Sequence, residues 1–456
     1  MFSLLTWMIT AAIAADGPKP VSFEADVKPI LREHCARCHG DDVHKSDLNL
    51  QSYAATLKGG SGGEVVIAGR PGGSSLYQAI AREGDALPMP PNRPRIADAE
   101  VAIVRQWIAE GLRETPDGAP AMSRRSLDFK PPASLKLDAG PGAMPSHLPP
   151  LEIPTTRRPQ PITALASSPR APLIAVAGHE QILLYQTESQ SPLGALAFPE
   201  GVPFVLRFSR DGGVLLAAGG RPVRSGKVVL FDVRTGKRLA EIGDELDSIL
   251  AADLSPDQRL VALGGTGKIV KVYSTADGKL LYTINKHTDW IRALQFSPDG
   301  SKLASGDRSG AVHLWESSTG GILLSLSDHK DAIEAIDWRG DGQALATAGE
   351  DGKLIVWDAQ GGWPSITLDA PHTPRATAKG RGKRPGGVLS VEFTREGKLI
   401  TSGRDRFVRF WDGSGKPLAA YETPDALPTK VAASFDGRTI LAGDASGRLH
   451  SWKTQP

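Results

Sequence analysis

The C-terminal two thirds of the chain consists of short segments of alternating or continuous apolar residues, separated by turn residues. Residues 353–357 (Lys-Leu-Ile-Val-Trp) are one such segment. Asp-Gly or closely related turn sequences recur at 209–212, 255–258, 297–300, 339–342, 394–397 and 434–437. Apolar segments joined by tight turns are typical of antiparallel β-strands. The pattern therefore predicts an all-β region over residues 161–456.

An aromatic residue ends one strand in each of a series of repeats. These residues lie 41–54 positions apart, close to the period of the four-stranded blades of WD-repeat propellers. Their positions are Tyr185, Phe231, Tyr273, Trp315, Trp357, Trp411 and Trp452. We therefore expect a seven-bladed WD-repeat β-propeller. Because only four residues follow Trp452, we expect a segment within 145–156, near Leu151, to supply the outer strand of the last blade.

WD repeats share a hydrogen-bonded set of His, Ser or Thr, Asp and Trp. The fifth repeat contains the full set: His329, Thr347, Asp351 and Trp357. The fourth repeat has Ser309 where Asp is expected, and in the sixth an insertion makes His372 a doubtful partner. The first three repeats have Tyr or Phe in place of Trp, so we expect them to be degenerate.

Helical periodicity replaces the β pattern nearer the N-terminus. Val27, Ile30 and Leu31 fall on one face of a predicted helix. A second predicted helix runs from Asp98, a candidate N-cap, to about Leu112. It carries an apolar stripe at Val101, Val104, Trp107 and Ile108. We therefore expect a small all-α domain in front of the propeller.

Composition sets the remaining boundaries. Residues 1–15 contain no charged side chain and end in Ala12-Ile13-Ala14, which predicts a cleaved signal peptide and an exported, periplasmic protein. The helical domain then spans 16–114, and a Pro- and Gly-rich linker spans 115–160. No other stretch is apolar enough to suggest a transmembrane span. The formal net charge of +2 argues against a dedicated nucleic-acid binder.

The chain has two cysteines, and they lie in one motif. Cys35-Ala36-Arg37-Cys38-His39 has the C-x-x-C-H spacing of covalent c-type haem attachment. Two thiols one helical turn apart can each bond a vinyl group on one edge of the porphyrin, and the adjacent His then binds the iron. Two alternatives stay open on the motif alone: a redox dithiol, or half of a zinc site completed by His34, His44 or a carboxylate.

A second iron ligand is expected from Met89. It is the one methionine within residues 16–114, and it lies in Leu87-Pro88-Met89-Pro90-Pro91. Prolines fix φ and limit backbone freedom, so this stretch can hold a thioether in place. It also follows His39 in the chain order that a cytochrome c fold requires.

These motifs together resemble the planctomycete-type cytochrome c domain. The resemblance covers about residues 22–113 and includes Val27-Lys28-Pro29-Ile30-Leu31, the C-x-x-C-H-G motif, Leu48-Asn49-Leu50, Ser74-Ser75-Leu76 and Met89-Pro90-Pro91. It implies one haem c bound covalently by Cys35 and Cys38, with His39 and Met89 as axial ligands.

A haem iron with His and Met ligands is coordinatively saturated, so we expect a one-electron carrier rather than an enzyme. The propeller would bind a redox partner protein or act as a scaffold. Two alternatives are a propeller redox enzyme supplied with electrons by its own cytochrome domain and a non-redox haem sensor or scaffold. A basic insertion at 375–384 could dock an anionic partner, although a solvated loop is the simpler interpretation. We expect structural roles for His287 and His329, and no metal-binding role for His179, His313 or His450.

Overall fold

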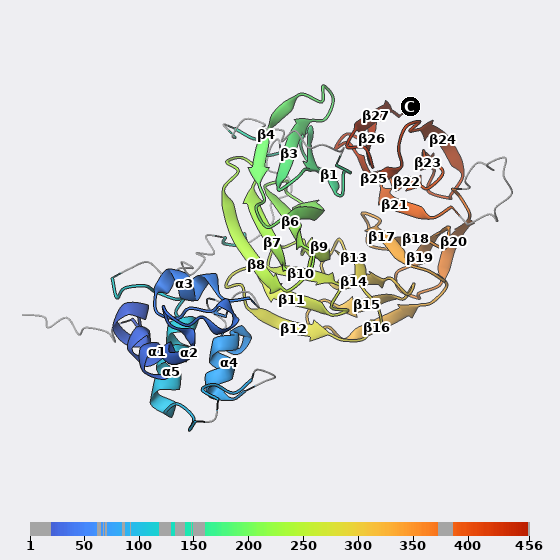
Figure 1. The fold of residues 1–456 in the computed structure, drawn as a ribbon. Helices are drawn as coiled ribbons and strands as arrows, with labels where there is room; N and C mark the ends of the chain where they lie inside the picture. The colour runs from blue at the N-terminus through green and yellow to red at the C-terminus, as the bar shows by residue number, and fades with distance from the viewer. Residues whose placement is uncertain are drawn as a thin grey trace, which may run out of the picture. The chain divides into compact units, whose positions relative to one another are not determined.

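The chain folds into two compact units, Met1–Ser126 and Leu127–Pro456. The first is helical and the second is built of strands (Figure 1). The computed structural model describes residues 20–61, 65–66, 68, 71–83, 87–91, 93–117, 129–132, 142–146, 148, 160–372 and 386–454. The expected signal peptide, 1–15, lies outside these described residues. No helix in the described part of the chain has the length and apolar character of a membrane span.

The first unit is a set of short helices, as its periodicity predicted. They are η1 (Phe23–Val27), α1 (Lys28–His34), α2 (Ala36–His39), η2 (Lys45–Asp47), α3 (Tyr53–Lys58), η3 (Pro71–Gly73), α4 (Ser75–Ala81) and α5 (Asp98–Ala109). The α5 helix begins one residue earlier than a capping Asp98 requires: Ala97 occupies the N-cap position, and Asp98 instead pairs with Arg95 at 2.6 Å.

An aromatic cluster holds this helical unit together. The Phe23 ring lies 5.7 Å from that of Tyr53 and 5.6 Å from that of Trp107. The Trp107 Nε1–H donates to the Arg113 carbonyl at 2.8 Å, and the Tyr53 hydroxyl donates to that of Leu112 at 2.7 Å. The predicted apolar stripe of α5 is buried along its whole length. Both ends of the unit are therefore fixed to one core.

The second unit is the predicted seven-bladed β-propeller (Figure 1). The strands of the first four blades are β1 (Leu165–Ser167), β2 (Leu173–Ala177), β3 (Gln181–Gln186), β4 (Pro192–Ala197), β5 (Val202–Phe208), β6 (Val214–Arg221), β7 (Ser225–Asp232), β8 (Arg238–Glu245), β9 (Ile249–Leu254), β10 (Leu260–Gly265), β11 (Val270–Ser274), β12 (Leu280–Ile284), β13 (Ile291–Phe296), β14 (Lys302–Asp307), β15 (Val312–Glu316) and β16 (Ile322–Leu326). In each blade, sequential strands pair antiparallel.

The remaining blades continue the same order around the ring. Their strands are β17 (Ile333–Trp338), β18 (Ala344–Gly349), β19 (Lys353–Asp358), β20 (Pro364–Asp369), β21 (Val388–Phe393), β22 (Leu399–Gly403), β23 (Phe407–Trp411), β24 (Pro417–Glu422), β25 (Pro428–Ala433), β26 (Thr439–Asp444) and β27 (Leu449–Lys453). The last blade has three strands among the described residues. The segment near Leu151, expected to supply its fourth, lies outside the described residues.

The ring closes through contacts between the first and last blades. The Ile162 N–H donates to the Asp444 carbonyl at 3.0 Å, and the Thr429 hydroxyl donates to the Ile162 carbonyl at 2.6 Å. Ile162 is buried in one apolar cluster with Leu441. Backbone hydrogen bonds and apolar packing thus both contribute to closure.

The polar network of the fifth blade is complete, as predicted. His329 Nε2 lies 2.7 Å from Thr347 Oγ1, and its Nδ1 lies 3.1 Å from Asp351 Oδ2. Trp357 Nε1–H donates to the same Thr347 hydroxyl at 2.8 Å. The network connects three segments of one blade, so His329 has the structural role expected of it.

Two further blades have networks that the sequence did not predict. In the fourth blade Asp307 takes the role we assigned to position 309: His287 Nδ1 lies 2.9 Å from Asp307 Oδ2, and Ser309 donates to Asp307 instead. In the sixth blade His372 is a full partner, 2.8 Å from Asp405 Oδ1. The expectation of a complete network in the fifth blade alone was therefore wrong.

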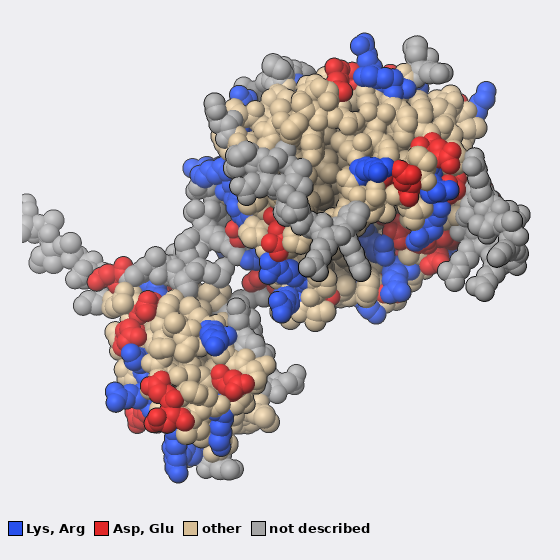
Figure 2. Space-filling model, turned by 45° about the horizontal axis from the view of Figure 1, so that its top comes forward, with Lys and Arg blue, Asp and Glu red and all other residues tan. Residues whose placement is uncertain are grey.

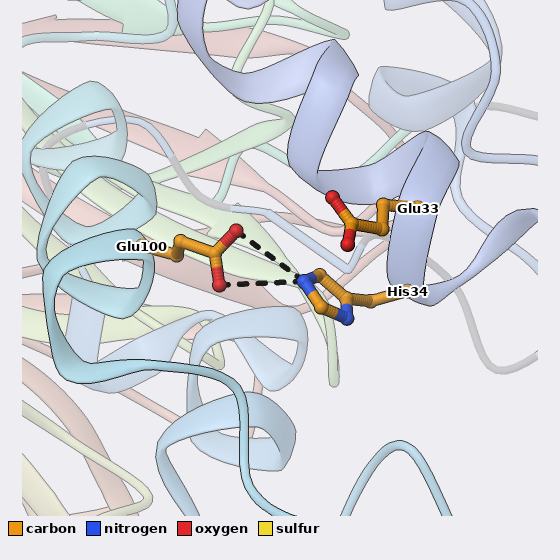
Figure 3. Close-up of side chains that lie close together, drawn as sticks. All are labelled: Glu33, His34 and Glu100. Atoms are coloured by element: carbon orange, nitrogen blue, oxygen red, sulfur yellow. Dashed lines mark hydrogen bonds and ion pairs between the residues drawn. The ribbon is translucent and has the colours of Figure 1, made fainter.

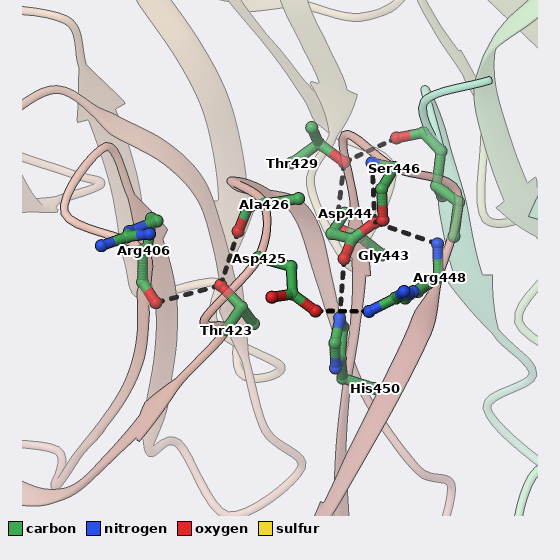
Figure 4. Close-up of polar contacts among 11 residues, drawn as sticks. Arg406, Thr423, Asp425, Ala426, Thr429, Gly443, Asp444, Ser446, Arg448 and His450 are labelled. Atoms are coloured by element: carbon green, nitrogen blue, oxygen red, sulfur yellow. Dashed lines mark hydrogen bonds and ion pairs between the residues drawn. The ribbon is translucent and has the colours of Figure 1, made fainter. Parts of the chain in front are cut away.

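The seventh blade uses a different histidine for its network. His450, on β27, places Nε2 2.8 Å from Asp444 Oδ2 (Figure 4). Asp444 also accepts hydrogen bonds from the backbone N–H groups of Ser446 and Arg448, at 2.8 and 2.9 Å. His450 therefore stabilises the loop between β26 and β27.

Parts of the predicted linker pack against the propeller. Phe129 is buried in one apolar cluster with Leu216. The Gly142 N–H donates to the Arg170 carbonyl at 3.3 Å, and the Ser146 N–H donates to that of Arg234 at 2.8 Å. These stretches therefore add to the propeller surface, a role that composition did not predict. The basic insertion, 375–384, lies outside the described residues.

Candidate haem-binding site

The C-x-x-C-H motif forms a tight helical corner between α1 and α2. Cys35 is both the C-cap of α1 and the N-cap of α2, and its N–H donates to the Leu31 carbonyl at 2.9 Å. Its own carbonyl accepts from the N–H groups of Cys38 and His39, at 3.1 and 2.9 Å. Both thiols and the imidazole therefore project from one turn, which is the arrangement that covalent attachment to one porphyrin edge requires.

The chain reverses direction immediately after His39. The Gly40 N–H donates to the Val43 carbonyl at 3.0 Å, and the His39 carbonyl accepts from the Leu50 N–H at 2.9 Å. A Cβ at Gly40 would lie 2.3 Å from the Ala36 carbonyl oxygen, so a side chain cannot be accommodated there. The backbone that carries His39 is consequently fixed on both sides.

The two thiols are free and half-buried. Burial, with a smaller contribution from neighbouring Cys38, raises the pKa of Cys35 to about 11. Redox dithiols depend on a thiolate with a lowered pKa, whereas buried thiols of raised pKa are poor nucleophiles. The environment of Cys35 therefore does not favour the redox-dithiol alternative.

The imidazole of His39 has an unused polar atom. Its Nδ1 is buried and has no hydrogen-bond partner among the described residues. Buried polar atoms in native structures nearly always have a partner, so an orphan of this kind needs a physical explanation. A histidine prepared to bind a metal-containing group fits this observation, and the site residues present are compatible with haem.

Met89 lies in the segment that connects α4 to α5 and is half-buried. Its N–H donates to the Ala79 carbonyl at 3.0 Å. The side chain of Arg82, at the end of α4, donates to the Arg93 carbonyl at 2.8 Å. These two bonds connect the segment to α4. Ligation of iron by Met89 stays a prediction.

A triad of side chains beside the motif was not predicted as a unit. Glu33, His34 and Glu100 bring one potential ligand atom each to within 4.8 Å of one another (Figure 3). This triad is the one candidate metal cluster among the described residues, and it contains neither cysteine. The zinc-site alternative for Cys35 and Cys38 therefore gains no support within the described part of the chain.

The axis of the propeller opens into a cavity of about 680 Å³. Its lining includes Arg207, Asp253, Asp337 and Glu392, from four different blades. Burial raises the pKa of Asp253 to about 6 and that of Glu392 to about 8. The three carboxylates accept hydrogen bonds from backbone N–H groups of the next blade: Asp253 from Phe296 (2.8 Å), Asp337 from Phe393 (2.6 Å) and Glu392 from Ala433 (2.9 Å). They therefore join neighbouring blades.

Charged side chains of both signs are interspersed on the surfaces seen in Figure 2. Neither unit presents a broad area of one sign on the face shown. This agrees with the small formal net charge of +2. The described residues on the face shown therefore form no extended basic area of the kind that nucleic-acid binding uses.

Two known protein families match separate parts of the chain. The family model described as Planctomycete cytochrome C matches residues 35–93. The model described as WD domain, G-beta repeat matches residues 278–316, 320–358 and 375–412. No curated protein matches the chain. The chain thus combines a cytochrome c-like domain, whose family indicates haem binding, with a WD-repeat propeller.

Proposed function

We propose that this protein is an exported one-electron carrier whose propeller docks a partner protein. The observation that carries the proposal is the helical corner of Cys35, Cys38 and His39, with its orphaned buried imidazole nitrogen. The family match over 35–93 supports the same function.

Each residue of the site has a defined role in this proposal. Cys35 and Cys38 would hold a haem covalently through their thiols, and His39 and Met89 would bind its iron. When bound, haem supplies an Fe(III)/Fe(II) couple for transfer of single electrons. The buried apolar cluster that includes Phe23 and Trp107 packs against α1 and α5. It limits the access of water to the haem-binding residues.

The propeller offers a rigid docking surface. Its blades are joined by hydrogen bonds between inner strands, and its axial cavity displays guanidinium and carboxylate groups together. WD-repeat propellers commonly mediate protein interactions. Affinity purification from the native host would identify the partner.

One preparation tests the central part of the proposal. The full-length protein, produced in a host that attaches c-type haem, should retain haem on a denaturing gel and give a single c-type spectrum. The matched variant C35A/C38A should lose the covalent haem. A chromophore beyond one c-type haem would instead favour a propeller redox enzyme. If the haem could not be reduced and reoxidised reversibly, a sensor or scaffold would be favoured.

A further inference from the structure

We propose that Glu33, His34 and Glu100 form a binding site for a divalent first-row metal ion, with zinc as the best match. The triad joins two helices: Glu33 and His34 end α1, and Glu100 lies in the first turn of α5. The haem residues take no part in it. This site therefore stands apart from the proposed electron-transfer function.

The spacing of His34 and Glu100 matches that of two ligands in the coordination shell of zinc. His34 Nε2 lies 3.3 Å from both carboxylate oxygens of Glu100 (Figure 3). Two ligands that are each about 2.0–2.1 Å from a tetrahedral zinc ion lie about 3.3 Å apart. The same 3.3 Å is long for a hydrogen bond, whose usual range is about 2.7–3.2 Å. His34 and Glu100 form a hydrogen bond and an ion pair at this distance, and the same distance allows both groups to bind one ion.

The charges of the triad also favour a bound cation. Two carboxylates face one imidazole, and neither Glu33 nor Glu100 forms an ion pair with a Lys or Arg among the described residues. Glu33 is exposed, so a change of rotamer can bring its carboxylate to the ion. One imidazole with two carboxylates suits zinc, whereas calcium and magnesium prefer all-oxygen shells.

The site also has a place for the remaining ligand. The side chains of His34 and Glu100 are 25% and 29% exposed, so water can reach the centre of the triad. Three protein ligands and one water complete a tetrahedral shell. A bound ion would fix the end of α1, immediately before Cys35, to the first turn of α5.

The experiment uses the metal-free, full-length, haem-loaded protein and zinc chloride. Calorimetry with the native protein should give one zinc per chain, and saturating zinc should raise the unfolding temperature. E100Q and E33Q should each weaken zinc binding at least tenfold. E24Q is the matched control, because Glu24 is exposed, pairs with Lys28 instead, and lies in η1, directly before α1. Its zinc binding should equal that of the native protein.

X-ray absorption at the zinc edge separates this site from free thiols. The expected shell has one imidazole nitrogen with oxygen ligands and no Zn–S distance of about 2.3 Å. A sulfur ligand, native affinity in both E100Q and E33Q, or no zinc binding would overturn the proposal. Because neither glutamate binds haem, failure here leaves the c-type spectrum, and with it the proposed function, untouched.

Discussion

His372 Nδ1 lies 2.8 Å from Asp405 Oδ1, although the basic insertion falls between them in the chain. His372 Nε2 also lies 2.8 Å from Thr401 Oγ1, and Trp411 donates to that hydroxyl at 2.9 Å. Arg409 approaches the second oxygen of Asp405 at 2.6 Å. Burial lowers the pKa of His372, so the imidazole acts mainly as a neutral hydrogen-bonding group.

We expect H372A to destabilise the propeller by about 3 kcal/mol. The substitution removes one buried hydrogen-bond partner from each of Asp405 and Thr401, and the loss of such a partner is costly for a buried polar or charged group. Urea unfolding followed by tryptophan fluorescence would measure the loss. H179A is the control, since His179 is exposed, and its unfolding midpoint should match that of the native protein. Equal midpoints for H372A and H179A would contradict the structural role.

His313 should make the propeller sensitive to mild acid. Burial, aided by the nearby charges of His287 and Lys286 and opposed by Asp307, lowers the pKa of His313 to about 4 from 6.5. Below pH 6.5, His313 is therefore protonated in the unfolded chain, whereas in the folded chain it becomes protonated only near pH 4. The contribution of His313 to stability is complete above pH 6.5 and is lost as the pH falls to 4.

H313Q removes this titration. Relative to the native protein, its free energy of unfolding should rise by up to about 3 kcal/mol between pH 6.5 and pH 4. Denaturant titrations at several pH values, with H179Q as the control, give the difference directly. Native and H313Q curves that stay parallel across this range would show that His313 titrates normally.

M89A should keep its haem and lose its low-spin Met ligation. Cys35 and Cys38 are untouched, so attachment persists, while the far-red charge-transfer band should disappear and the reduction potential should fall. Carbon monoxide should bind the reduced variant readily. M144A is the control, because Met144 packs against the propeller. A native protein that already binds carbon monoxide and lacks the far-red band would exclude Met89 as a ligand.

Export should leave Ala15 or Asp16 as the first residue of the mature protein, because the Ala12-Ile13-Ala14 pattern precedes them. N-terminal sequencing of the protein from the periplasmic fraction checks this. Recovery of Met1 from the cytoplasmic fraction would contradict both the cleavage site and the compartment.

Patterns that repeat along the chain were the predictable part of this structure. The spacing from Tyr185 to Trp452 gave the number of blades, because every blade needs the same length of chain. Predictions that placed each network residue at a fixed distance along the repeat failed where a side chain at another position makes the hydrogen bond. Asp307 serves its network two residues before the expected place, and His372 does so across an insertion.

The site shows the same division between local and long-range information. The corner from Cys35 to His39 is local in sequence, so its motif specifies it. The approach of Glu100 to His34 spans 66 residues and depends on how α5 packs against α1. No spacing rule reports such a contact. The anchoring of Met89 by Ala79 is likewise a product of the folded backbone.

Closure of the propeller through Ile162 and Thr429 has a consequence for the order of folding. These residues are 267 positions apart, whereas the hydrogen bond from Val21 to Glu110 in the helical unit spans 89. Contacts between distant residues form late, because the entropy of closing the intervening loop opposes them. During synthesis, the N-terminal unit can complete its core while the blades have not yet closed into a ring. A chain interrupted before Thr429 would therefore yield a finished helical unit followed by an incomplete propeller with two exposed edges.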